Sequence, residues 1–133
     1  NDISQIVLML AFWIIAILIV ISILVITNTV KVSVYSRRIE LNIMKYVGAT
    51  DFFIQMPYFI EGIIIGIVAG IFTLILTYFT YTNILSPIIY DLGLFTPVPM
   101  QSKIFSFGLF YIIAGGLIGM IGSVYPVKKY LNV

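Results

Sequence analysis

Few side chains in this chain could do chemistry, and its two glutamates are the ones that stand out. The 133 residues include no His and no Cys. The commonest general base, the commonest metal ligand and thiolate nucleophiles are therefore missing. A phosphate-binding Gly-rich loop ending in Lys-Ser or Lys-Thr is also absent. We expect a non-catalytic protein that holds no metal and no cofactor of its own.

One of the two glutamates, Glu61, lies about one helical turn inside a long apolar run. An acid at membrane depth is a candidate for function, although bonding a neighbouring helix or reaching back to the interface is its more ordinary role. The middle of every apolar run lacks titratable residues of the kind that relay protons. A coupled ion transporter is therefore not expected, and we treat Glu61 as a membrane-boundary acid.

The other glutamate, Glu40, interrupts the apolar side of an amphipathic segment at 35–47. On a helix, one side of this segment is polar apart from Leu41, and the other side is apolar apart from Glu40. The polar side carries Arg37, Arg38, Asn42 and Lys45, and the apolar side carries Ile39, Ile43, Met44, Tyr46 and Val47. Such a helix either lies among lipid headgroups or docks its apolar ridge into a groove on a cytoplasmic partner. A glutamate facing lipid is costly, which favours docking.

A tight corner is predicted to follow this amphipathic helix. Gly48 suits the position just after a helix end, where a positive φ is needed. Thr50 suits the N-cap of a second helix, and Asp51 is favourable near that helix's positive end. The second helix is expected to run from Asp51 into a membrane span.

The overall composition places these segments in a membrane. Of the residues, 62% are apolar and 9% are charged, and the mean hydropathy is +1.18, whereas a soluble domain is roughly half apolar and about a quarter charged. This balance argues against a soluble enzyme, a disordered tail or a nucleic-acid-binding domain. The long uncharged runs predict an all-α integral membrane protein with three spans, because crossing the hydrocarbon takes about 20 residues. The spans are predicted at 4–27, 57–82 and 104–125.

Basic residues predict the orientation of these spans. Six of the seven Lys and Arg lie in 28–56 and in the tail 126–133, so both segments are expected in the cytoplasm. The loop 83–103 holds only Lys103 and is expected outside, with a short helix capped by Ser86-Pro87 and stopped at Gly93. A start outside the membrane leads us to expect a further span or an external domain before residue 1.

Glycines recur at helical spacing in two of the spans. They are Gly62, Gly66 and Gly70 in the second span, and Gly115, Gly119 and Gly122 in the third. Such small residues let helix backbones approach closely. Ordinary packing between helices is the favoured interpretation, while a homodimer seam or a sliding contact uses the same physics and stays open.

The segment 36–50 resembles the cytoplasmic signature of the FtsX family of cell-division membrane proteins, and it reads SRRIELNIMKYVGAT. The following Pro57, Glu61 and the spaced glycines of the second span fit the same pattern. The chain departs from the family at Asn42, where a second Glu is usual, and at Tyr46, where Leu is usual. Neither change removes the apolar ridge, although Asn42 weakens the idea that two acids are needed for docking.

This resemblance implies the last three spans of a four-span permease whose large external domain lies between the first two. It implies a homodimer paired with two copies of a cytoplasmic ABC-type ATPase, FtsE, which would bind ATP and Mg. ATP-driven movement would then activate a peptidoglycan hydrolase or its adaptor outside the plasma membrane, at the division septum. The segment 35–47 would be the coupling helix. Its implied contact residues are Arg38, Ile39, Glu40, Ile43, Met44, Val47 and Gly48.

Two other functions remain open from the sequence. One is the permease subunit of a substrate-exporting, MacB-like ABC transporter, which shares the coupling-helix logic. The other is a membrane anchor for an external domain, with no motor attached. A substrate-stimulated ATPase would favour the exporter, and failure to co-purify an ATPase would favour the anchor.

Overall fold

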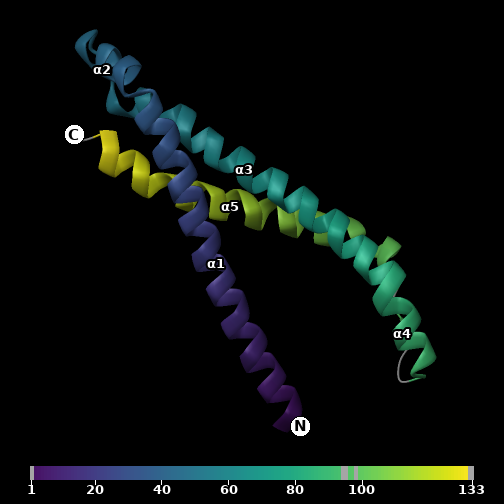
Figure 1. The fold of residues 1–133 in the computed structure, drawn as a ribbon. Helices are drawn as coiled ribbons and strands as arrows, with labels where there is room; N and C mark the ends of the chain where they lie inside the picture. The colour runs from purple at the N-terminus through teal and green to yellow at the C-terminus, as the bar shows by residue number, and fades with distance from the viewer. Residues whose placement is uncertain (1, 94–95, 98, 132–133) are drawn as a thin grey trace.

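In the computed structural model, residues 2–93, 96–97 and 99–131 are described, with the backbone only for 130–131. The described part is almost entirely helical, with no strand in it (Figure 1). The long helices are α1 (Asp2–Ser36), α3 (Asp51–Thr80) and α5 (Ile104–Leu131). The short elements are α2 (Arg38–Tyr46), a π segment (Tyr81–Leu85), α4 (Ser86–Asp91) and a 3-10 turn (Met100–Ser102).

Within the described residues, three helices are long and apolar enough to cross a membrane, which confirms the predicted all-helical, three-span class. They are Asp2–Ser36, the continuous helical stretch Asp51–Asp91 and Ile104–Lys129. Each exceeds the roughly 20 residues that span the hydrocarbon. Each helix is therefore long enough to span the bilayer even when it is tilted.

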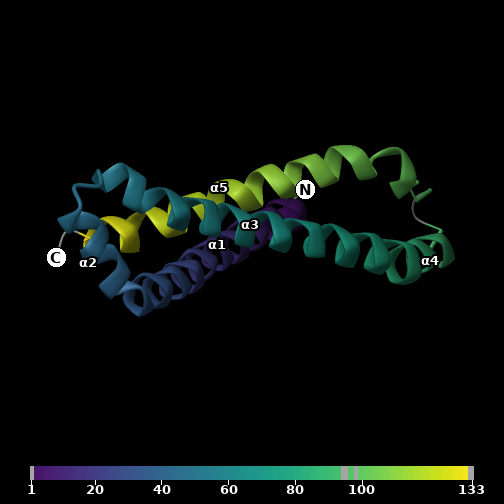
Figure 2. The same cartoon turned by 90° about the horizontal axis from the view of Figure 1, so that it is seen from above.

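The helices α3 and α5 run side by side and make the most extensive contact in the molecule (Figures 1 and 2). The helix α1 meets this pair only through its C-terminal half, and its N-terminal half diverges from it (Figure 1). The buried residues of α1 are accordingly confined to Ile26, Val30 and Val34. The rest of α1 carries apolar side chains on all sides, as suits contact with lipid.

A small apolar core lies where α1, α2, α3 and α5 converge. It joins the end of α1 to the beginning of α3 and the end of α5. Its buried members are Ile26, Val30, Val34, Leu41, Ile54, Tyr58 and Val127. The predicted tail at 126–133 is therefore not separate from the last span, because α5 continues to Leu131 and Val127 is fully buried.

The amphipathic helix is shorter than the predicted 35–47. Tyr35 and Ser36 belong to α1, which continues well past the predicted span boundary, and the helix breaks at Arg37 with φ −102° and ψ 12°. Because 35–47 contains no Pro or Gly, the sequence predicted one unbroken helix there. The break comes from packing, because the turn at Arg37 lets Leu41 reach the core.

The corner after α2 has the predicted geometry. Gly48 adopts φ 94°, and its N–H donates to the carbonyl of Lys45 at 3.1 Å, while Ala49 N–H donates to Met44 at 3.0 Å. These two backbone hydrogen bonds form a Schellman motif, which satisfies the last carbonyls of α2. Thr50 is the N-cap of α3, and its hydroxyl accepts a bond from Phe53 N–H at 3.4 Å.

The predicted N-cap at Ser86 is wrong, although the short helix exists. Leu85, just before α4, is itself helical, with φ −72° and ψ −45°, so α3 continues through the π segment into α4 without a break. A proline clashes with the carbonyl four residues earlier, here Asn83. Asn83 lies in the π segment, where the wider turn accommodates Pro87. The predicted stop at Gly93 is confirmed by its φ of 62°.

Candidate functional site

The helix α2 buries one side chain in the molecule, Leu41. Every residue of α2 is described, and Leu41, 7% exposed, is the only one that is buried. It packs in the core with Val34, Ile54 and Tyr58. The residue that interrupts the polar side in the sequence is therefore the buried anchor of the helix, while Arg37, Arg38, Asn42 and Lys45 around it stay exposed.

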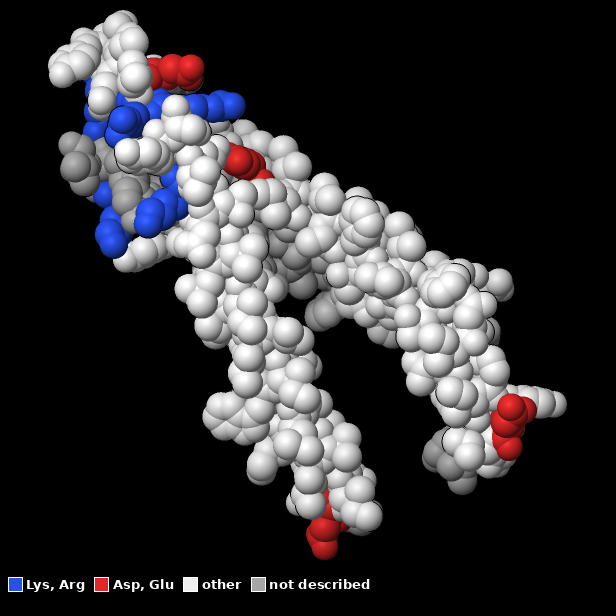
Figure 3. All heavy atoms as spheres, in the orientation of Figure 1, with Lys and Arg blue, Asp and Glu red and all other residues white. Residues whose placement is uncertain are grey.

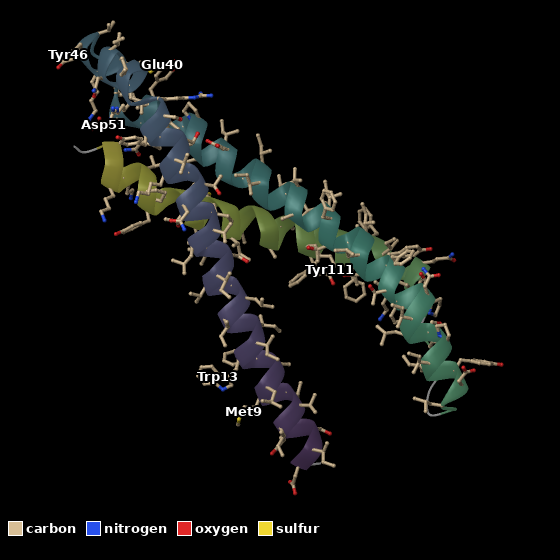
Figure 4. All side chains as sticks on the ribbon, viewed as in Figure 1. Met9, Trp13, Glu40, Tyr46, Asp51 and Tyr111 are labelled. Atoms are coloured by element: carbon tan, nitrogen blue, oxygen red, sulfur yellow. The ribbon has the colours of Figure 1, made fainter. Side chains whose placement is uncertain are left out.

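The apolar ridge of α2 consequently points away from the protein. Ile39 is 69% exposed and Val47 is 83% exposed, and Ile43 and Met44 are exposed as well. Tyr46 projects from the end of the molecule (Figure 4) and is 90% exposed. Four predicted contact residues therefore lie together on one accessible face, and Gly48 lies at its end.

Arg38, in contrast, is held back against α1. Its Nη1 donates to the Tyr35 hydroxyl at 2.7 Å, and its guanidinium carbon lies 4.5 Å from the centre of the Tyr35 ring. The guanidinium thus spans the break between α1 and α2. Of the predicted contact residues, Arg38 is the one whose charged group is already engaged within the protein.

The first turns of α3 extend the ridge beyond the predicted residues. Phe52 and Phe53 are exposed, as is Met56. They line a groove of about 740 Å³ together with Glu40 and Met44 of α2. These three residues were not predicted as part of the site, although apolar side chains between the Thr50 cap and the predicted span were an available signal.

We call this combined face the α2–α3 surface. It carries one acid, Glu40, which is exposed in the first turn of α2 (Figure 4). Its members are Ile39, Glu40, Ile43, Met44, Val47, Phe52, Phe53 and Met56.

The α2–α3 surface lies at the basic end of the molecule. Lys and Arg gather there, around α2 and the ends of α1 and α5, whereas the opposite ends carry acidic atoms (Figure 3). An apolar surface with one carboxylate among many cations can select a partner by shape and by charge.

The spaced glycines form one seam between α3 and α5. A Cβ on Gly62 would lie 2.6 Å from the carbonyl oxygen of Gly119, and one on Gly70 would lie 2.6 Å from that of Tyr111. A Cβ on Gly66 would meet the backbone of Gly115 directly. The two backbones therefore touch without intervening side chains, which is the close approach that small residues permit.

Gly122 lies outside this seam and contacts α1 instead. A Cβ there would be 2.9 Å from Cβ of Ile26, and the Thr27 hydroxyl donates to the Gly122 carbonyl at 2.9 Å. The sequence grouped Gly122 with Gly115 and Gly119. The structure separates it because successive faces of α5 meet different helices.

Glu61 bonds a neighbouring helix. The hydroxyl of Ser33 in α1 donates to Glu61 Oε2 at 3.0 Å. The bond ties α1 to α3 beside the core. Ser33 was not singled out in the sequence, because a lone serine four residues before a basic pair gives no signal of a partner in another helix.

No group of three or more acidic, His or Cys side chains that could hold a metal occurs among the residues described in the structure.

The architecture and its exposed ridge define a class: helical membrane proteins whose spans carry a small amphipathic helix at one end. The chain matches the model of the family "FtsX-like permease C-terminal" over residues 6–133, and it belongs to that family. Membership, together with the three long apolar helices, makes it a multi-pass plasma-membrane protein.

Known relatives carry the name cell division protein FtsX. The chain is 36% identical to the one from Bacillus anthracis and 34% identical to the one from Bacillus subtilis (strain 168), each over 81% of this chain and 37% of the relative. Identity to the Streptococcus pneumoniae serotype 2 protein is 29%, over 89% of this chain and 39% of the relative. The chain thus spans somewhat over a third of these proteins. No solved structure matches it.

Proposed function

We propose that this chain is the membrane part of an FtsEX-type complex, which transmits ATP-driven movement across the bacterial plasma membrane during cell division. The observation that carries the proposal is the exposed α2–α3 surface, an apolar ridge fixed to a membrane span and bearing one carboxylate. The names of the relatives support the cell-division role.

The proposed partner at this surface is a cytoplasmic ABC-type ATPase that holds the ATP and Mg. Ile39, Ile43, Met44 and Val47 would enter its groove, and Glu40 would pair with a Lys or Arg on its rim. The positive-inside rule supports a cytoplasmic position for this end, because six of the seven basic residues lie in 28–56 and the C-terminal tail.

The joint between α2 and α3 is suited to passing a displacement onward. The Schellman motif and the Thr50 cap leave little freedom between the two helices, and Leu41 fixes α2 from the inside. A push on the ridge would therefore tilt α3 rather than bend the corner. Along the glycine seam, the backbones of α3 and α5 are in close contact, so a tilt of α3 would be passed on to α5.

The signal would emerge at the opposite end, near α4 and the loop that follows it. The proposed receiver is an external peptidoglycan hydrolase or its adaptor, at the division septum. A second copy of this chain would complete the complex, since an ABC-type ATPase works as a pair.

Charge reversal at Glu40 tests the ATPase contact. In Glu40→Lys, a cation would face the partner's basic rim, and like charges across an interface cost several kcal/mol. We expect at least about a tenfold loss of ATPase recovered by pull-down from membranes, with the amount of inserted protein unchanged.

The control is Asp91→Lys, which makes the same charge change at the other end of the molecule and should leave recovery intact. Equal recovery in Glu40→Lys would remove Glu40 from the interface. An ATPase that never co-purifies with the native protein would support the anchor function, and a substrate-stimulated ATPase would support an exporter.

A further inference from the structure

A hollow of about 510 Å³ lies on α5 near its C-terminal end, at the basic end of the molecule (Figure 3). It shares no residue with the α2–α3 surface or with the groove there. Its lining is one stripe of α5, with members three or four residues apart along the helix. They are Ile121, Val124, Tyr125, Lys128 and Lys129. The ATPase contact proposed above gives this stripe no role.

The stripe lies on the side of α5 that faces away from the other helices. Ile121 is 56% exposed and Tyr125 is 61% exposed, whereas the residues between the members of the stripe are buried. Pro126 has no N–H for the carbonyl of Gly122, and the Thr27 hydroxyl of α1 donates to that carbonyl instead, at 2.9 Å. One side of α5 is therefore held against α1, and the hollow opens on the opposite side, toward the membrane.

The chemistry of the stripe changes with depth in the membrane. The positive-inside rule places Lys128 and Lys129, which are both exposed, beside the cytoplasmic headgroups. Ile121 precedes Lys128 by seven residues, or about 10 Å along a helix, and so lies nearer the hydrocarbon. Tyr125 lies between these levels, at the boundary where tyrosine is enriched. From the cytoplasm inward, the stripe thus presents cations, then an aromatic ring, then aliphatic side chains.

The charged part of the hollow is purely cationic. Within the described part of the chain, no Asp or Glu lines it. The Nζ of Lys129 lies 5.6 Å from the centre of the Tyr125 ring, a cation–π contact that holds this ammonium at the hollow. Two neighbouring ammonium groups attract an anion, and a phosphate is the anion found at this depth of a bilayer.

We propose that this hollow binds an anionic phospholipid, such as phosphatidylglycerol. The phosphate would lie at Lys128 and Lys129, the rest of the headgroup would point toward the cytoplasm, and the acyl chains would run along Val124 and Ile121 toward the hydrocarbon. The order of groups in the lipid therefore matches the order of residues along α5. A zwitterionic lipid carries its own cation next to the phosphate, and the two lysines would repel that cation, so such a lipid fits less well.

The test compares lipids that differ only in the headgroup. Native mass spectrometry of the full-length protein is performed with phosphatidylglycerol, phosphatidylcholine and phosphatidylethanolamine of identical acyl chains, and the first lipid retained by each chain is scored. We expect phosphatidylglycerol to bind about tenfold better than either zwitterionic lipid, because each lysine near the membrane surface favours an anionic lipid.

Two double variants separate this hollow from the general charge of the basic end. Lys128→Gln with Lys129→Gln should bring the ratio of phosphatidylglycerol to phosphatidylcholine binding close to one. Lys31→Gln with Lys45→Gln is the matched control, since it removes two exposed cations from the same end but outside the hollow. The control should keep the native ratio. An equal loss of preference in both double variants would show diffuse attraction and overturn the proposal.

A measurement on the native protein does not depend on any variant folding. Added phosphatidylglycerol should raise its melting temperature in detergent more than phosphatidylcholine does, because a ligand that binds only the folded state stabilises it. Equal stabilisation by the two lipids, or a preference that survives loss of both Lys128 and Lys129, would overturn the proposal. None of these outcomes bears on whether an ATPase docks on the α2–α3 surface.

Discussion

Leu41 shows how one side chain decides what a small helix presents. It is the apolar residue on the polar side of α2, and the core captures it. Its burial leaves the apolar ridge exposed. The ridge is thus available to a partner, and the exposed Glu40 among its residues favours docking of a protein over contact with lipid.

Leu41 and Ile43 should therefore respond differently to truncation. Leu41→Ala removes buried contacts and should lower the free energy of unfolding by about 2 kcal/mol. Ile43, which is 57% exposed, should affect stability by less than about 0.5 kcal/mol when changed to Ala. Chemical denaturation of the purified protein in detergent measures both.

Binding of the ATPase should depend on Ile43, although the stability of the protein does not. Ile43→Ala removes a proposed anchor and should weaken ATPase recovery in a pull-down, even though the protein itself is as stable as before. If Ile43→Ala lowered stability as much as Leu41→Ala, the outward orientation of the ridge would be wrong.

At the scale of elements, the corner and the seam make α2, α3 and α5 act together. At the corner, backbone bonds from Gly48 and Ala49 close the end of α2 and the Thr50 hydroxyl caps the start of α3, while the glycine seam brings α3 against α5. At the other end, α3 continues through the π segment into α4. One helical stretch, Asp51–Asp91, thus connects the proposed docking surface to the opposite side of the membrane.

The seam predicts a strong difference between Gly66 of α3, which lies in it, and Gly116 of α5, whose Cβ would have an ordinary contact. Gly66→Ala puts a methyl group against the backbone of Gly115, which cannot move away without separating the helices. Such overpacking costs about 1–3 kcal/mol. Gly116→Ala places its methyl 3.8 Å from Cγ1 of Ile67, an ordinary contact, and should be tolerated.

Thermal unfolding in detergent distinguishes the two variants. We expect a lower melting temperature for Gly66→Ala and a native one for Gly116→Ala. Equal melting temperatures would show that α3 and α5 do not approach each other closely at Gly66.

At the scale of the whole molecule, charge and packing are concentrated at the same end. The basic residues gather around α2 and the ends of α1 and α5, where the core also lies (Figure 3). Farther from this end, α1 diverges from the other two spans, and its apolar side chains are exposed to the surroundings. The basic end is therefore the most firmly assembled part of the chain, as a docking platform requires.

The orientation can be checked by labelling, because the chain has no native Cys. Tyr46 is 90% exposed at the basic end, and Tyr90 is 76% exposed at the other. On intact cells, a membrane-impermeant maleimide should label Tyr90→Cys and leave Tyr46→Cys unlabelled until the cells are opened. The opposite pattern would place the basic end outside and exclude a cytoplasmic ATPase there.

Local rules of chain geometry explain most of the successful predictions. Apolar runs predict spans, Gly48 and Gly93 predict left-handed helix ends, and Thr50 predicts a cap, because each depends on a few adjacent residues. The break at Arg37 and the continuous passage into α4 were missed. The break at Arg37 depends on packing contacts, and the passage into α4 depends on a wide turn, and the adjacent residues specify neither.

The sequence by itself determined the membrane class, the three spans and the amphipathic character of α2, since hydrophobicity and periodicity act along the chain. Only the tertiary structure decided that Leu41 is buried, that Gly66 faces Gly115, and that Ser33 bonds Glu61. The physical reason is that each helix has several faces suited to packing. Which face meets which neighbour depends on how all the helices fit together.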